Sequence, residues 1–157
     1  MKKGRRGGSR RHEVSTEDRM SMSLEELEGD YWSEPTSPTT LVASVHRMRK
    51  LPLRDLRTED LRVAIGQEVG LAHLVPLALT TLEQDPFAEG DYYPGDLLSA
   101  VANKVGPSFW REDRDLAQRF RRILEQSLAR ISETEPPPSL ESDLRYALEQ
   151  LPRPAAV

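Results

Sequence analysis

The residues best suited to do chemistry lie together in one short stretch of the chain. Residues 86–96 read PFAEGDYYPGD, which combines three carboxylates, two adjacent tyrosines, two prolines and two glycines. Clustered carboxylates can hold a metal ion or transfer protons, and tyrosines beside acids are also common in protein interfaces. The side chains concerned are Glu89, Asp91, Tyr92, Tyr93 and Asp96.

The stretch does not have the spacing of a calcium-binding loop. An EF-hand loop needs oxygen ligands at alternate positions and a glycine at its sixth position, whereas counting from Glu89 places tyrosine and proline at the fifth and sixth. The chain has no cysteine, and its three histidines form no H-x-x-x-H or H-x-x-E pattern. We therefore predict no metal ion, no cofactor and no catalytic residue, so that the chain is not an enzyme. A site assembled from scattered Asp and Glu stays open as an alternative.

Two interpretations of residues 86–96 remain. In the first, the stretch is a helix start: Pro94 suits the first turn, the helix dipole favours Asp91 and Asp96, and one or both tyrosines pack beneath the loop. In the second, exposed acids and tyrosines on a rigid loop bind a partner, since Tyr gives contact area with little loss of entropy. The segment Asp30-Tyr31-Trp32 repeats this combination, unless Trp32 fills the interior of the fold. The predicted partner-binding residues are Glu89, Asp91, Tyr92, Tyr93, Asp96, Asp30 and Tyr31.

Hydrophobic periodicity predicts the elements that position these loops. Apolar residues recur at helical spacing in segments beginning near residues 23, 41, 58, 74, 97, 116 and 140, and no stretch alternates like a strand. Ser23 with Glu26 and Gly29 gives the first helix a capping box and a terminator. The segment with Leu74 and Leu82 is the most apolar and is expected at the centre. The sequence predicts an all-α, small single-domain helical bundle with about six helices.

Composition divides the chain into three predicted parts. Residues 1–22 form a disordered basic tail, residues 23–132 a helical domain, and residues 133–157 a proline spacer with a C-terminal helix that packs on the bundle or mediates self-association. Met20 and Met22 immediately precede the first periodic segment, so they are candidate starts of translation. No apolar run approaches the roughly 20 residues that cross a bilayer, and no signal-peptide core follows the basic start. Together with the absence of cysteine, this favours a cytoplasmic protein without membrane contact.

Charge is unevenly distributed along the chain. The first twelve residues hold six basic groups and no acid, so the total of 22 basic and 26 acidic groups leaves 16 against 26, or −10, for the remainder. An acidic body argues against nucleic-acid binding by the folded part and fits a basic partner. A small DNA-binding regulator that uses the basic tail stays open as an alternative function.

Most of the chain resembles a known family, the immunity proteins of contact-dependent growth inhibition (CDI) systems. The resemblance covers residues 23–131. It rests on SLEELEGDYW at 23–32, on HRMRKLPLRDLRTEDLRVAIGQEVGLAHLVPLAL at 46–79 and on EQDPFAEGDYYPGDLL at 83–98. The last two stretches carry four ordered features: K-x-P-L, T-E-D-L-R, I-G-Q-x-x-G-L and E-G-D-x-Y-P-G-D-L-L. The basic tail and the segment after Ile131 depart from the pattern.

The resemblance implies a function without catalysis. Such a protein binds the toxic C-terminal domain of its cognate growth-inhibition protein, often a basic nuclease, and occludes the active site. The identity and activity of the toxin, and the oligomeric state of this chain, do not follow from the sequence. The resemblance also favours a structural role for residues 89–96, because shared motifs often hold a fold while the contact surface diversifies. The contact surface would then lie on other acidic stretches, at Glu133 and Glu135 or at Glu112, Asp113 and Asp115.

Overall fold

The structure of the chain is a computed structural model that describes residues 14–154. Within these residues it is built from helices, with two isolated β-bridges and no strand. The α-helices are α1 (Thr16–Met20), α2 (Leu24–Glu28), α3 (Thr40–Arg49), α4 (Thr58–Gly66), α5 (Leu71–Gln84), α6 (Asp96–Lys104), α7 (Pro107–Glu112), α8 (Arg114–Arg130) and α9 (Leu140–Gln150). Two short 3₁₀ helices, η1 (Leu53–Asp55) and η2 (Ile131–Glu133), lie among them. The all-α prediction is confirmed.

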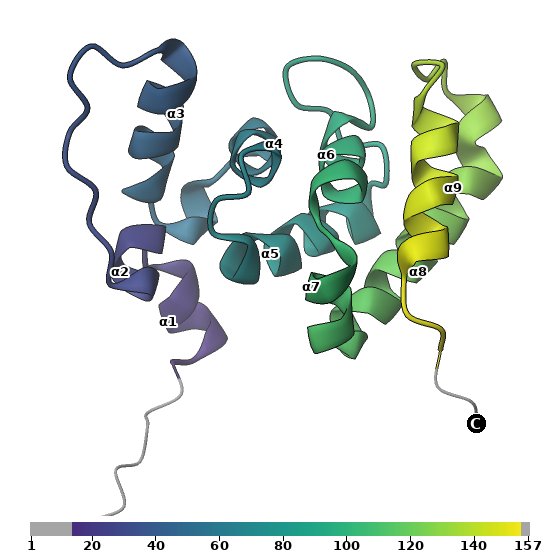
Figure 1. Cartoon of the computed structure of the whole chain (residues 1–157), viewed down its shortest axis with the longest axis horizontal. Helices are drawn as coiled ribbons and strands as arrows, with labels where there is room; N and C mark the ends of the chain where they lie inside the picture. The colour runs from purple at the N-terminus through teal and green to yellow at the C-terminus, as the bar shows by residue number, and fades with distance from the viewer. Residues whose placement is uncertain (1–13, 155–157) are drawn as a thin grey trace, which may run out of the picture.

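Helix α5 lies at the centre of the bundle, as its apolar sequence predicts. It packs against α4, α6 and α8, while α9 closes the far end against α6 and α8 (Figure 1). Its inward side chains are fully buried; they are Leu74, Val75, Ala78, Leu79 and Leu82. Burying an aliphatic side chain of this size contributes about 1.5–3 kcal/mol, so this helix is a main source of stability.

The predicted cap of α2 is present, and a second capping arrangement begins α4. The Ser23 hydroxyl accepts the Glu26 N–H at 3.2 Å, and Gly29 ends the helix in the left-handed conformation. At α4 the carboxylate of Asp60 accepts the Arg57 N–H at 2.9 Å and pairs with Arg47 of α3 at 3.1 Å. Asp60 therefore satisfies a free N–H at the helix start and joins α3 to α4.

The described residues contain nine α-helices, more than the number predicted. Helix α1 lies within the segment predicted as a tail, where no apolar period marks a helix; residues 1–13 of that segment lie outside the described residues. Helix α7 begins at Pro107, so the Gly106-Pro107 pair starts a helix as well as ending one. Asp113 then separates α7 from α8 by accepting the Leu116 N–H at 3.1 Å.

The C-terminal helix shares the core of the bundle. Leu140, Leu144 and Ala147 of α9 are buried, and they belong to the same continuous apolar cluster as Leu24 near the other end of the chain. Trp110 of α7 stacks on Phe120 of α8 with ring centroids 4.7 Å apart, which anchors the long helix in the core. Within residues 14–154, no helix has both the length and the apolar character needed to span a membrane.

Candidate functional site

The loop that joins α5 to α6 closes on itself above the core. Glu89 and Pro94 form an isolated antiparallel bridge, and the Gly95 N–H donates to the Phe87 carbonyl at 3.1 Å. Gly95 caps α6 with a φ of 94°, a conformation that favours glycine. Phe87 is buried and Tyr93 is half-buried, whereas Tyr92 is exposed, so only one of the two tyrosines is partly covered.

Asp96, the first residue of α6, holds the loop from below. Its carboxylate is buried and accepts the Gly90 N–H at 2.7 Å and the Tyr92 N–H at 3.1 Å. The expectation that Asp96 offers an exposed carboxylate is therefore wrong. The physical reason is that a carboxylate at a helix start can fold back on the preceding loop and satisfy its N–H groups.

Glu59 of α4 holds the other side of the same loop. Its Oε2 accepts the Asp91 N–H at 2.8 Å, and Arg62 donates to Oε2 at 2.7 Å and to Oε1 at 2.5 Å. The hydrogen bonds from Arg62 lower the pKa of the Glu59 carboxyl below its ordinary value. Gly90 makes the approach possible, because a Cβ there would lie 2.4 Å from Glu59 Oε2.

Sequence reasoning did not select Glu59 or Arg62 as site residues. The two residues belong to the T-E-D-L-R motif, which lies about one helix and one loop away from the E-G-D-x-Y-P-G-D motif in sequence. The signal that could have pointed to Glu59 and Arg62 was that both motifs occur in the pattern of the same family. The structure gives the physical link: Glu59 of the first motif holds the backbone of the second, and Arg62 of the first motif holds Glu59.

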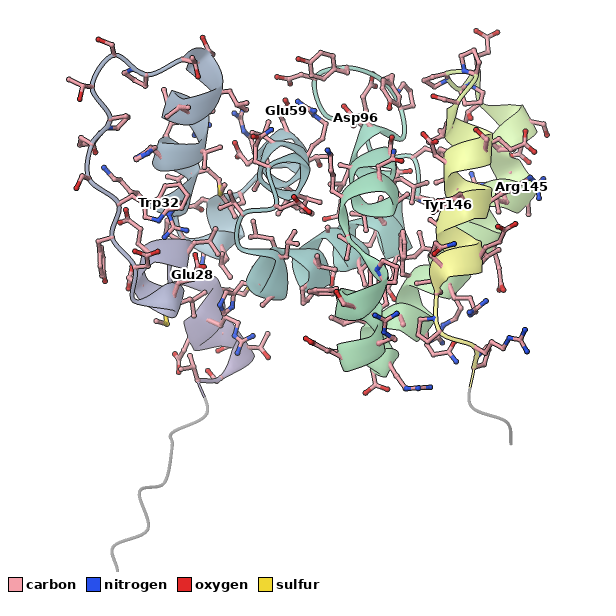
Figure 2. All side chains as sticks on the ribbon, in the orientation of Figure 1. Glu28, Trp32, Glu59, Asp96, Arg145 and Tyr146 are labelled. Atoms are coloured by element: carbon pink, nitrogen blue, oxygen red, sulfur yellow. The ribbon has the colours of Figure 1, made fainter. Side chains whose placement is uncertain are left out.

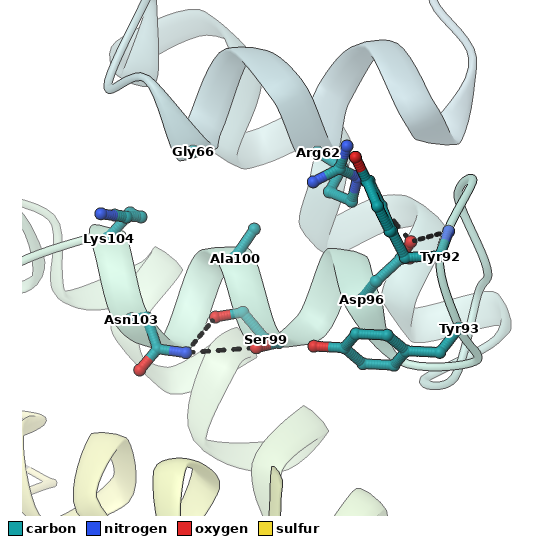
Figure 3. A pocket seen from close by; sticks show the side chains of 9 residues that line it. All are labelled: Arg62, Gly66, Tyr92, Tyr93, Asp96, Ser99, Ala100, Asn103 and Lys104. Carbon is teal, nitrogen blue, oxygen red and sulfur yellow. Dashed lines mark hydrogen bonds and ion pairs between the residues drawn. The ribbon is translucent and has the colours of Figure 1, made fainter. Parts of the chain in front are cut away.

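The two tyrosines of the loop have different surroundings. Tyr92 is 71% exposed, and its ring lies over the guanidinium of Arg62 with the Cζ atom 4.4 Å from the ring centroid. Tyr93 is half-buried and extends alongside Ser99 (Figure 3). Both line a groove of about 330 Å³ between α4 and α6 (Figure 3). The other residues that line this groove are Arg62, Gly66, Asp96, Ser99, Ala100, Asn103 and Lys104.

Glu89 and Asp91 are the exposed acids of the loop. Both side chains face solvent, and neither forms an ion pair within residues 14–154. The Asp91 backbone is nevertheless fixed through its N–H to Glu59. The loop therefore presents two free negative charges and one aromatic ring on a backbone that is held at several points.

The second predicted loop, at Asp30 and Tyr31, is held by an arginine instead of by carboxylates. Arg49 of α3 is buried, donates to Glu28 at 2.5 Å and to the Asp30 carbonyl at 2.6 Å, and lies 4.1 Å from the Trp32 ring centroid. The Asp30 carboxylate accepts the Trp32 Nε1–H at 3.1 Å, and Tyr31 is 67% exposed. Trp32 does not fill the interior as the alternative interpretation expected, because it stays 37% exposed beside His46.

The structure does not bring the two predicted loops into one site. Trp32 and Glu28 lie on one side of α4, whereas Asp96 lies on the other side, towards α6 (Figure 2). Glu59, on α4 itself, accepts a hydrogen bond from the loop at 86–95. Each loop adjoins a groove, of about 330 Å³ beside Tyr92 and of about 220 Å³ beside Trp32. The loop at 86–95 differs in exposing two acids, whereas residues 30–32 expose one.

Two carboxylates, those of Glu59 and Asp96, lie close together beneath this loop. Glu59 and Asp96 both lie near Gly90, with Arg62 Nε 2.7 Å from Glu59 and 3.7 Å from Asp96. Their oxygens accept three backbone N–H groups and the guanidinium, and the lowered pKa keeps Glu59 ionised. These are the properties of carboxylates that hold a loop, since a general acid needs a raised pKa. Within the described residues, no three His, Asp or Glu side chains are grouped to hold a metal ion.

Comparison with known protein families identifies the family of this chain. Residues 26–120 match the family model described as CDI immunity proteins, which confirms the resemblance over more than half of the chain. The matched range contains α3 to α7, the loop at 86–95 and both residues that hold it from α4. No curated protein matches the chain.

Proposed function

The chain belongs to the CDI immunity proteins, and we propose that it binds a cognate CDI toxin domain in the cytoplasm and neutralises it by occluding its active site. The chain acts as an inhibitor and catalyses no reaction of its own. The observation that carries this proposal is the loop at 86–95, which presents Glu89, Asp91 and Tyr92 to solvent while carboxylates fix its backbone from below.

Charge supports a basic partner, and we propose that the toxin is a nuclease. Residues after the twelfth carry 16 basic and 26 acidic groups, a net charge of −10. Nucleases grip phosphate backbones with Lys and Arg, so their active-site surface attracts an acidic protein. Opposite charge of this kind accelerates association and favours one orientation of the complex.

The proposed contact surface is the exposed part of the loop. Glu89 and Asp91 supply charge that no cation of the described residues neutralises, and Tyr92 supplies an exposed ring. A ring surrounded by polar residues is a common arrangement at the centre of tight interfaces. Asp96 contributes indirectly in this proposal, by holding the loop. Tyr93 contributes through the wall of the groove, and Asp30 and Tyr31 lie outside the primary contact.

Co-expression with the toxin domain encoded beside this gene tests the proposal. Cells that produce both proteins should grow, and the chain should co-purify with the toxin domain. A variant lacking residues 1–13 should protect equally, whereas a DNA-binding regulator that uses this basic segment would lose its function. Tyr92→Ala should reduce protection, and Tyr146→Ala, which removes a comparably exposed tyrosine on α9, should not. Toxicity that persists with the intact chain, without a complex, would contradict the proposal.

A further inference from the structure

Tyr92 combines high exposure with a fixed position. The residue is 71% exposed, yet its N–H donates to Asp96 at 3.1 Å, and the preceding N–H, of Asp91, donates to Glu59 at 2.8 Å. An exposed tyrosine normally samples several rotamers, and ordering such a side chain opposes binding. Here the backbone that carries the ring is already held by two carboxylates, the buried Asp96 and the half-buried Glu59.

Arg62 gives the ring a flat surface on which to lie. Its guanidinium is fixed by two hydrogen bonds to Glu59, at 2.7 and 2.5 Å, and its Cζ atom lies 4.4 Å from the Tyr92 ring centroid. The Arg62 side chain is only 22% exposed. A planar cation held in this way can stack on an aromatic face, which the ammonium of a lysine does with less directional preference.

We infer that Tyr92 is the anchor through which the chain recognises its toxin partner, and that Arg62 is the positioning residue that holds the Tyr92 ring in its binding orientation. This inference rests on the proposed function. Glu59 supports the arrangement by fixing the guanidinium and the Asp91 backbone together. Rigid aromatic residues that are ordered before binding are frequent hot spots, because little conformational entropy remains to be lost.

The arrangement at Trp32 shows what a mainly structural version of the same contact looks like. The Arg49 side chain is only 1% exposed, and it donates to the Asp30 carbonyl in the backbone of the loop that carries Trp32. Arg62 makes no hydrogen bond to the backbone of the 86–95 loop; it reaches that loop through the Tyr92 ring and Glu59. It also lines the groove beside the ring, where a bound partner would lie (Figure 3). Arg62 therefore contacts this loop directly only through the Tyr92 ring, and it acts on the loop backbone indirectly, through Glu59.

A double-mutant cycle in binding tests this inference. The probe is the purified toxin domain encoded beside this gene, and the dissociation constant is measured for the wild type, Arg62→Lys, Tyr92→Ala and the double variant. We expect Tyr92→Ala to weaken binding by about 30-fold or more, as removal of an anchor does. Arg62→Lys should weaken binding by about 10-fold in the wild type and by less than about 2-fold in the Tyr92→Ala background.

Two further variants separate positioning from folding. Tyr92→Phe keeps the ring over the guanidinium, so Arg62→Lys should still weaken binding in that background. Tyr146→Ala serves as the matched control, because this tyrosine is 64% exposed on α9 and should leave the dissociation constant unchanged. Thermal unfolding of each variant shows whether it is folded at the assay temperature.

The outcomes distinguish the inference from the proposed function. If the wild type binds and Arg62→Lys has the same effect with and without the Tyr92 ring, Arg62 does not position the ring and the inference is overturned. If Tyr92→Ala binds as tightly as the wild type, Tyr92 is not the anchor. If the wild type does not bind the toxin domain at all, the proposed function itself is contradicted.

Discussion

Replacing Gly90 with alanine tests the geometry on which the loop at 86–95 depends. A Cβ at this position would lie 2.4 Å from Glu59 Oε2 and 2.9 Å from Asp96 Oδ2, both too close for an unshifted contact. The loop or the carboxylates must therefore move. Moving Glu59 breaks its 2.8 Å hydrogen bond from the Asp91 N–H and disturbs its pairing with Arg62.

The magnitude follows from the bonds affected. A hydrogen bond to a charged group contributes about 1.5–3 kcal/mol, so disturbing those to Glu59 and Asp96 should destabilise the fold by about 3 kcal/mol. Alanine restricts the unfolded chain more than glycine does, which offsets up to about 1 kcal/mol. The net loss should be about 2 kcal/mol, which for a chain of this length lowers the melting temperature by about 4–8 °C.

Thermal unfolding followed by circular dichroism measures this shift, because the described fold is helical. Gly66→Ala is the control: Gly66 ends α4, a Cβ there meets nothing within 4 Å, and alanine in a helix should stabilise by about 0.5–1 kcal/mol. The penalty at Gly90 should also shrink in a Glu59→Ala background. A Gly90→Ala variant that melts at or above the wild-type temperature would refute the placement of the two carboxylates.

Two other predictions concern the rest of the fold. Arg49→Met should lower the free energy of unfolding by about 2–3 kcal/mol, because it leaves the Glu28 carboxylate and a backbone carbonyl without their donor. Arg145→Met, on the surface, should change the free energy of unfolding by less than about 0.5 kcal/mol. Equal effects of the two variants in urea denaturation would contradict this prediction. Burial, assisted by the charge of Arg19, lowers the pKa of His73. The unfolded state therefore binds more protons, so the stability that neutral His73 contributes should be present above about pH 6.5 and lost as the pH falls below it. The dependence of the unfolding free energy on pH in this range should be smaller in His73→Gln.

The elements with strong local signals could be predicted from the sequence. The Ser23 capping box with its glycine terminator and the apolar period of α5 each arise from residues close in sequence, and the structure has both. Helix α1 has no apolar period; its local signals are the Ser15 side chain, which accepts the Asp18 N–H, and the acids of its first turn, and it packs against η1. A single-sequence pattern contains no information on such tertiary contacts.

The candidate site could be predicted only in part. The composition of residues 86–96 indicated a loop with acids and tyrosines, and Glu89, Asp91 and Tyr92 are exposed as the interface interpretation requires. The burial of Asp96 could not be predicted, because the same residue type at a helix start can face solvent or fold back on the loop. The hydrogen bond from Asp91 to Glu59 joins residues 32 positions apart, and only the packing of α4 against α6 determines it.

The affinity of the purified chain for its toxin domain tests the central claim most directly. The wild type should form a tight complex. Glu89→Lys with Asp91→Lys should weaken it by about 100-fold or more and slow its association. Glu125→Lys with Glu149→Lys, which makes the same change in net charge at two exposed acids on α8 and α9, should change it by less than about 3-fold. The absence of a complex, or equal losses from the two charge reversals, would contradict an immunity protein that acts through this loop.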